Sequence, residues 1–150
     1  MRRVTTAVAA VVLLVGAAAA SAQDTGAYSR VANPYQAEFP FELGQPVEPR
    51  VELGGILMSQ VVLTARGDVE AGRPVKCSVV VRGTGAAEAR ATLRLILLLE
   101  DDESRGLEKV VVDPFRIKAG KPFERDETVR IEGDALLGAS KVYLFAEVEP

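Results

Sequence analysis

The fold of this chain is decided by one stretch, Pro74-Val75-Lys76-Cys77-Ser78-Val79-Val80-Val81-Arg82. Its residues at 75, 77, 79 and 81 are apolar, and most of the residues between them are polar. A repeat of two residues is typical of a β-strand with one buried face, whereas an amphipathic helix repeats every three to four residues. We therefore expect a strand over 74–82 in which the side chains of Val75, Cys77 and Val79 point into a core.

Further strands of the same kind are expected on both sides of this stretch. They are predicted at residues 56–66, 90–100, 107–113, 123–132 and 141–149. Gly, Pro and Asp mark the breaks between them, and only Asp134–Leu137 suggests a helix, of one turn. Short strands without long helical patterns predict an all-β fold, an antiparallel sandwich of about six to seven strands over residues 51–150.

Two parts of the chain resemble immunoglobulin-like domains. Gly72–Val79 resembles the start of their second strand, where a turn precedes a strand with an inward cysteine. Asp134–Leu137 followed by Val142–Phe145 resembles the loop and tyrosine corner of their sixth strand. The resemblance implies an immunoglobulin-like β-sandwich in which Phe145 replaces the second cysteine and Cys77 stays unpaired. It implies no activity, because this architecture hosts many unrelated functions.

The last predicted strand, 141–149, leaves two questions open. Its better apolar face is not the one that carries Tyr143 and Phe145, so either both faces are covered or no tyrosine corner forms; that better face consists of Val142, Leu144, Ala146 and Val148. If 141–149 is the sixth strand, the chain ends before a seventh can form. A sandwich without its last strand exposes backbone groups and core.

Residues 23–50 form an extended N-terminal segment, rich in proline yet also rich in aromatic residues. Over 35–43, Tyr35, Phe39, Phe41 and Leu43 fall on one face of an alternating pattern. We expect this part to be a strand that fills the missing position, either in its own domain or in a neighbouring copy.

The first 22 residues have the layout of a secretory signal peptide. Arg2 and Arg3 precede an apolar stretch at 8–20, and Ala20-Ser21-Ala22 matches a cleavage site before Gln23. The apolar stretch is too short for a convincing membrane span, and the longest later apolar run, 95–99, is shorter still. The sequence therefore predicts an extracytoplasmic protein, secreted or periplasmic, whose mature chain has no membrane span.

Composition excludes several classes of chemistry. The chain has no histidine, which removes serine–histidine, cysteine–histidine and histidine-ligated zinc sites. Its net charge is −3 and its basic residues are scattered, which argues against nucleic-acid binding. Cys77 lies on the inward face of its strand, and Ser140 and Lys141 are adjacent and so point to opposite faces. We expect a protein that is not an enzyme and that carries no cofactor and no metal.

Surplus apolar residues lie opposite the predicted core, at Val62, Val80, Ile96 and Leu98. Together with Tyr35, Phe39, Phe41 and Leu43 they are the candidate partner-binding residues, although single exposed apolar side chains are common on protein surfaces. The leading hypothesis is a non-catalytic protein-interaction module. One alternative is a structural subunit that assembles by strand exchange through 35–43. A third hypothesis is a calcium- or carbohydrate-binding adaptor that uses the acidic turn 100–103, which lacks the spaced ligand pattern of calcium loops.

Export should remove the first 22 residues. Because Ala20-Ser21-Ala22 follows the apolar stretch, we expect the exported protein to begin at Gln23. N-terminal sequencing of protein recovered outside the cytoplasm measures this directly. A mature protein that still begins at Met1 would contradict the prediction.

Overall fold

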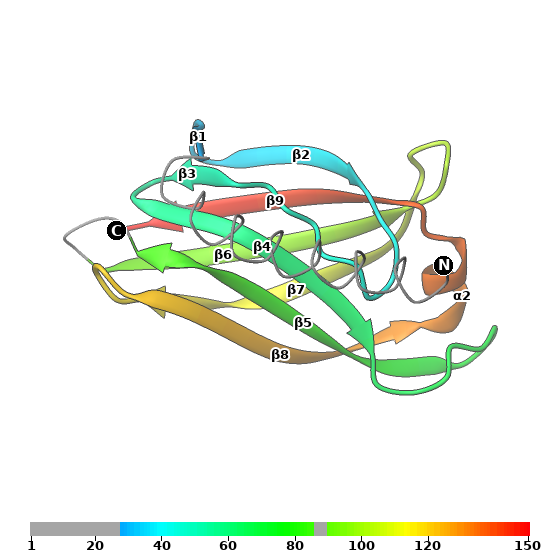
Figure 1. Ribbon diagram of the computed structural model, residues 1–150. Helices are drawn as coiled ribbons and strands as arrows, with labels where there is room; N and C mark the ends of the chain where they lie inside the picture. The colour runs from blue at the N-terminus through cyan, green and yellow to red at the C-terminus, as the bar shows by residue number, and fades with distance from the viewer. Residues whose placement is uncertain (1–27, 86–89) are drawn as a thin grey trace, which may run out of the picture.

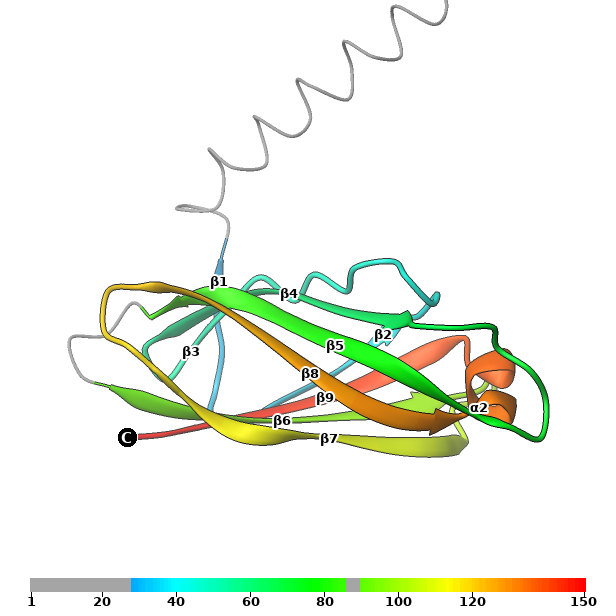
Figure 2. The same ribbon diagram turned by 90° about the horizontal axis from the view of Figure 1, so that it is seen from below.

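Two β-sheets packed face to face make up the computed structural model, which describes residues 28–85 and 90–150 (Figure 1). One sheet has the strand order β1-β3-β4-β5-β8 and the other β2-β9-β6-β7. Figure 2 shows the two layers from the side, with the short helix α2 at one end. The predicted all-β sandwich is confirmed. The predicted signal peptide lies outside the described residues.

The elements follow the predicted strands closely. Their bounds are β1 Ser29–Arg30, β2 Tyr35–Pro40, β3 Val51–Leu53, β4 Ile56–Ala65, β5 Pro74–Gly85, β6 Ala91–Glu100, β7 Gly106–Ile117, β8 Pro122–Glu132, α2 Gly133–Gly138 and β9 Lys141–Glu149. The sequence analysis missed β3, which pairs with β4 through a two-residue turn at Gly54-Gly55. Both glycines have positive φ, as tight two-residue hairpins require.

The N-terminal segment contributes a strand to each sheet. β1 pairs with β3 in the five-stranded sheet, and β2 pairs antiparallel with β9 along its whole length. β2 therefore occupies the edge position beside the last strand, within its own chain. Its alternate residues are partly buried, and the pattern continues to Phe41, which is 9% exposed.

The core lies between the sheets and consists of the alternating faces of the long strands. On β5, Cys77, Val79 and Val81 are fully buried, as their spacing predicted. On β6, the leucines at 93, 95, 97 and 99 face them from the opposite sheet, with exposures of 3% or less. Each such side chain contributes roughly 1.5–3 kcal/mol on burial, so these stripes supply the main driving force for folding.

The strands β7 and β8 close one side of the sandwich with polar contacts. A bulge in β7 places Asp113-Pro114 opposite Arg94, which interrupts the edge ladder. The free backbone N–H of Asp113 donates to the Glu127 carboxylate of β8 at 3.0 Å. Arg125 lies 5.4 Å above the Phe115 ring and pairs with Glu127 at 3.3 Å. These contacts give partners to Arg125 and Glu127, the two charged side chains on the inward side of β8.

Of the two alternatives for the last strand, the one without a tyrosine corner is observed. In β9 the inward residues are Val142, Leu144, Ala146 and Val148, so Tyr143 points to the outer face of the sheet. Its hydroxyl donates to the Gln36 side chain on β2 instead of to upstream backbone. Phe145 is outward as well and does not stand opposite Cys77 across the core. Only alternate residues of this strand can point into the core, and the aliphatic residues take those positions. Tyr143 therefore cannot make the corner contact that the sequence resemblance suggested.

Within the described part of the chain, no helix is both long and apolar enough to cross a membrane.

Cys77 should behave as an inert core residue. It is fully buried, and burial, followed by the charge of Glu108, raises the pKa of its thiol. We expect slow alkylation in native buffer and fast alkylation after unfolding, because the thiolate is the reactive form. Cys77→Ser should lower the free energy of unfolding by about 1–3 kcal/mol, since it buries a hydroxyl. Labelling followed by mass spectrometry, and urea unfolding of the variant, measure the two effects; rapid native labelling would contradict the burial.

Candidate functional site

An apolar stripe crosses the outer face of the four-stranded sheet. In the strand register, Val111 of β7 lies beside Ile96 of β6, and Ile96 lies beside Phe145 of β9. The next row places Leu98 beside Tyr143. Strands are about 4.8 Å apart, so the stripe extends over roughly 10 Å across three strands. We call these five residues the outer stripe.

The outer stripe has one well-exposed member. Val111 is 50% exposed, and the other four members are partly buried by their neighbours. Polar residues border it: Gln36 pairs with Phe145, and Lys109 pairs with Leu98. An apolar centre with a polar rim, containing aromatic side chains, is the composition of many protein interfaces.

The four surplus apolar residues of the sequence analysis do not form one patch. Ile96 and Leu98 belong to the outer stripe, but Val62 and Val80 pair with each other on the outer face of the opposite sheet. There they are flanked by polar pairs, such as Ser78 with Asp126. Alternation alone could not reveal this, because it gives the face of a strand but not its sheet.

The aromatic face of the N-terminal segment points into the sandwich. Tyr35, Phe39 and Leu43 are partly buried and pack against the core, and Phe41 belongs to it. Burial raises the pKa of the Tyr35 hydroxyl. These four candidate residues therefore contact their own domain in this structure.

Three members of the outer stripe escaped the sequence analysis. Val111 lies in a run of three valines, where either face of a strand fits the pattern. The sequence analysis leaves open whether Tyr143 forms a tyrosine corner, and it places Phe145 at the position of a cysteine. For Tyr143 and Phe145 the sequence did carry a signal, namely the better apolar face of β9. Because that face packs on the core, both aromatic side chains must point outward.

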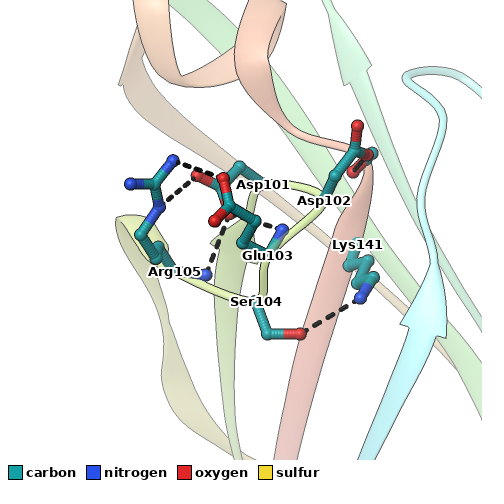
Figure 3. Close-up of polar contacts among 7 residues, drawn as sticks. Asp101, Asp102, Glu103, Ser104, Arg105 and Lys141 are labelled. Atoms are coloured by element: carbon teal, nitrogen blue, oxygen red, sulfur yellow. Dashed lines mark hydrogen bonds and ion pairs between the residues drawn. The ribbon is translucent and has the colours of Figure 1, made fainter.

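A polar cluster lies at one end of the same sheet, around the hairpin 101–105 (Figure 3). Asp101 accepts hydrogen bonds from the backbone N–H groups of Glu103 at 2.9 Å and Arg105 at 3.0 Å. Its carboxylate also pairs with the Arg105 guanidinium at 2.9 Å. The backbone N–H of Arg105, followed by its side chain, holds the pKa of Asp101 below its usual value.

The acidic side chains at 101–103 all have partners within the chain, and Asp101 and Glu103 share Arg105. Asp102 accepts a hydrogen bond from Ser140, and Glu103 pairs with Arg105 at 3.0 Å. Lys141 donates to Ser104 at 3.1 Å, as Figure 3 shows. Within residues 28–85 and 90–150, no three Asp, Glu or Cys side chains converge in a way that could hold a metal ion. The hairpin's geometry thus gives no support to the calcium hypothesis.

An open hollow of about 240 Å³ adjoins the cluster. Its lining consists of Glu38, Phe39, Pro40, Asp102, Ser140 and Lys141. Ser140 and Lys141 are consecutive, and their polar atoms contact different groups: Asp102 for the hydroxyl and Ser104 for the ammonium. A nucleophile–base pair between them is therefore absent from this arrangement.

Comparisons with known proteins assign the chain to no family. No family model and no curated protein matches the chain. Among solved structures, one match is the enzymatically active domain of tailspike protein 4 from bacteriophage CBA120, with 8% identity and a TM-score of 0.25. The match covers 78% of this chain but 17% of the tailspike chain.

This match corrects one expectation of the sequence analysis. We expected a protein that is not an enzyme, whereas the matching solved structure is an enzymatically active domain. The exclusion of enzymatic activity is therefore not retained. At this level of similarity the tailspike's activity does not carry over to the chain.

Proposed function

We propose that the protein is exported from the cytoplasm and binds a protein partner through the outer stripe. The observation that supports this most is the register of Val111, Ile96 and Phe145, which places three apolar side chains in one row on a solvent-facing sheet. Burying such a row against a partner removes apolar area from water, and aromatic residues at the centre of an interface often dominate its energy. Export rests on the signal-peptide pattern of the sequence.

We further propose that the sandwich is related to immunoglobulin-like domains. The order β4-β5-β8 in one sheet and β7-β6-β9 in the other is consistent with that architecture. In this assignment β2 occupies the place of the final strand beside β9. The N-terminal strand β2 then fills the sheet position next to β9 that no strand of residues 51–150 occupies.

A substitution in the outer stripe tests partner binding. Val111→Glu places a charge on the most exposed member of the outer stripe, at the β7 end of its row, so we expect the partner recovered with the exported wild-type protein to be lost. Leu137→Glu is the matched control, because Leu137 is 61% exposed but lies on α2, away from the stripe. Quantitative affinity capture with mass spectrometry measures both. Equal partner recovery with Val111→Glu would contradict the proposal, provided both variants keep the wild-type melting temperature.

A second candidate function is self-assembly by exchange of β2 between copies. The observation that favours it is the position of β2, an edge strand that contacts the rest of its sheet through β9. The chain reaches β2 from β1 by residues 31–34 and leaves it by residues 41–50. The same β2–β9 pairing could therefore form between two copies.

Exchange predicts concentration-dependent oligomers of the wild-type protein. The double variant Phe39→Ser/Phe41→Ser should abolish them, because each ring contributes roughly 1.5–3 kcal/mol to the docking of this segment. If β2 docks only within its own chain, the same variant lowers the free energy of unfolding of a protein that is a monomer throughout. Glu42→Ala, at an exposed position of the same segment, is the control. Light scattering over a range of concentrations, with urea unfolding, separates these outcomes; a wild-type monomer at every concentration would contradict exchange.

A further inference from the structure

The backbone ladder between β2 and β9 begins at Tyr35, which pairs with Ala146. Pro34 precedes it, and a proline has no N–H with which to continue a ladder. Asn33 and Pro34 form a bend, through which the chain passes from β1 in one sheet to β2 in the other. When the register of β2 is continued back by two residues, position 33 lies beside Val148 of β9.

The side chain of Asn33 pairs with β9 where the backbone ladder ends. Its Nδ2 group donates to the Val148 carbonyl oxygen at 2.8 Å, and its Oδ1 atom accepts from the Val148 N–H at 3.0 Å. In an antiparallel sheet, a hydrogen-bonded residue pair exchanges the same two bonds between backbone groups. A carboxamide carries both a donor and an acceptor, as a peptide group does. The contact therefore extends the pairing of β2 with β9 by a side chain.

The turn between β3 and β4, in the opposite sheet, closes over this contact. Gly54 of this turn has a φ of +52°, and a Cβ atom there would lie 2.9 Å from the Cβ of Val148 and 3.4 Å from Nδ2 of Asn33. Only glycine leaves room for such a close approach. On the other side of the bend, the Val31 N–H donates to the Glu52 carbonyl of β3 at 3.1 Å. The chain is thus held by one sheet at residue 31 and by the other at residue 33.

The apolar pattern of β2 does not by itself fix its register on β9. A shift by one residue exposes the buried face of the strand, but a shift by two keeps every side chain on its own face. Shifted by two residues toward the C-terminus of β9, Gln36 would lie beside Glu147 and Glu38 beside Phe145. In the observed register Glu38 pairs with Lys141, but both side chains are accessible to solvent, and such ion pairs contribute little.

Asn33 distinguishes between these registers. In the observed one, both polar groups of its short side chain meet the backbone of Val148. In the shifted one, position 33 would lie beside Pro150, which has no N–H to donate. A shift by two residues in the opposite direction carries Phe39 past Lys141, where β9 begins. The observed register is therefore the one that keeps both hydrogen bonds of Asn33 and the full pairing of β2.

We propose that Asn33 is a positioning residue: its carboxamide fixes the register of β2 on β9 and thereby places Gln36 at the rim of the outer stripe. In this register Gln36 lies beside Phe145 and accepts the hydrogen bond of the Tyr143 hydroxyl. The shifted register brings the charge of Glu38 beside Phe145 instead. The role in the register is independent of the proposed function, whereas the role at the rim rests on partner binding through the outer stripe.

NMR of the intact mature protein measures the register directly. In the wild-type protein, nuclear Overhauser contacts across the two strands should connect Glu38 with Tyr143 and show a single register. Asn33→Leu keeps a side chain of similar size but removes both hydrogen bonds, so a second set of contacts should appear that connects Glu38 with Phe145. The protection factor of the Val148 N–H against hydrogen exchange should fall by roughly tenfold, because its acceptor is lost. A single native register in Asn33→Leu, or an unchanged protection factor, would overturn the proposal.

Two further variants keep the test decisive. Asn33→Asp has the same shape and keeps the acceptor for the Val148 N–H, but at pH 7 it has no donor for the Val148 carbonyl. It should show the second register even if Asn33→Leu fails to fold, and a single native register in it counts equally against the proposal. Ser59→Ala removes a similar hydrogen bond in the opposite sheet, from a side chain to the Arg82 carbonyl at 2.9 Å, and should keep the single register. A second register in Ser59→Ala would show general loosening and would remove the special role of Asn33.

Affinity capture separates the role at the rim from the proposed function. Asn33→Leu leaves every side chain of the outer stripe unchanged, so loss of the captured partner supports the role of the register in placing Gln36. Full recovery of the partner by a variant whose register has shifted would overturn the role at the rim. Failure of the proposed function is seen separately, as undiminished capture by Val111→Glu, and the register measured by NMR does not depend on that result.

Discussion

The pairing of β2 with β9 is the contact on which the rest of the structure depends. β9 carries four of the buried side chains that join the two sheets, and it is central in its sheet only because β2 lies beside it. Without β2, the backbone groups along one side of β9 and the core beneath Phe41 would face water. A strand from the N-terminal part of the chain thus completes the sheet that the C-terminal part begins. The β2–β9 pairing joins residues that are far apart in the sequence. Closing the chain between them costs conformational entropy, and the burial of apolar side chains maintains the pairing once it has formed.

The same pairing also shapes the surface of the sheet. Since β9 gives its inward face to aliphatic side chains, Tyr143 and Phe145 must point outward, where they join Ile96, Leu98 and Val111. Gln36 of β2 borders this stripe and binds the Tyr143 hydroxyl. The proposed binding surface is therefore a consequence of how the core is filled. A change that moved β2 would alter the rim of the stripe as well.

Polar chemistry is concentrated at the ends and sides of the sandwich. At the β7–β8 side, Glu127 satisfies a backbone N–H that the bulge leaves free. At the hairpin end, the Glu38 carboxylate accepts a hydrogen bond from the Ser104 hydroxyl and lies 3.8 Å from the Lys141 ammonium. The first arrangement holds the β7 edge to β8 through a hydrogen bond. The second joins β2 to the hairpin by a hydrogen bond and to β9 by an ion pair.

The sequence by itself determined the longer strands, their inward faces and the fold class, but not the short strands β1 and β3. Alternation placed Cys77 and the leucines of β6 in the core, and it marked 35–43 as a strand despite its prolines, because a period of two is a local property of the chain. Tertiary structure alone decided which strands share a sheet. It separated Val62 and Val80 from Ile96 and Leu98, docked β2 within its own chain, and brought Glu38 to Ser104 from 66 positions away. Those outcomes depend on long-range pairing between strands, for which the periodicity of a single strand carries no information.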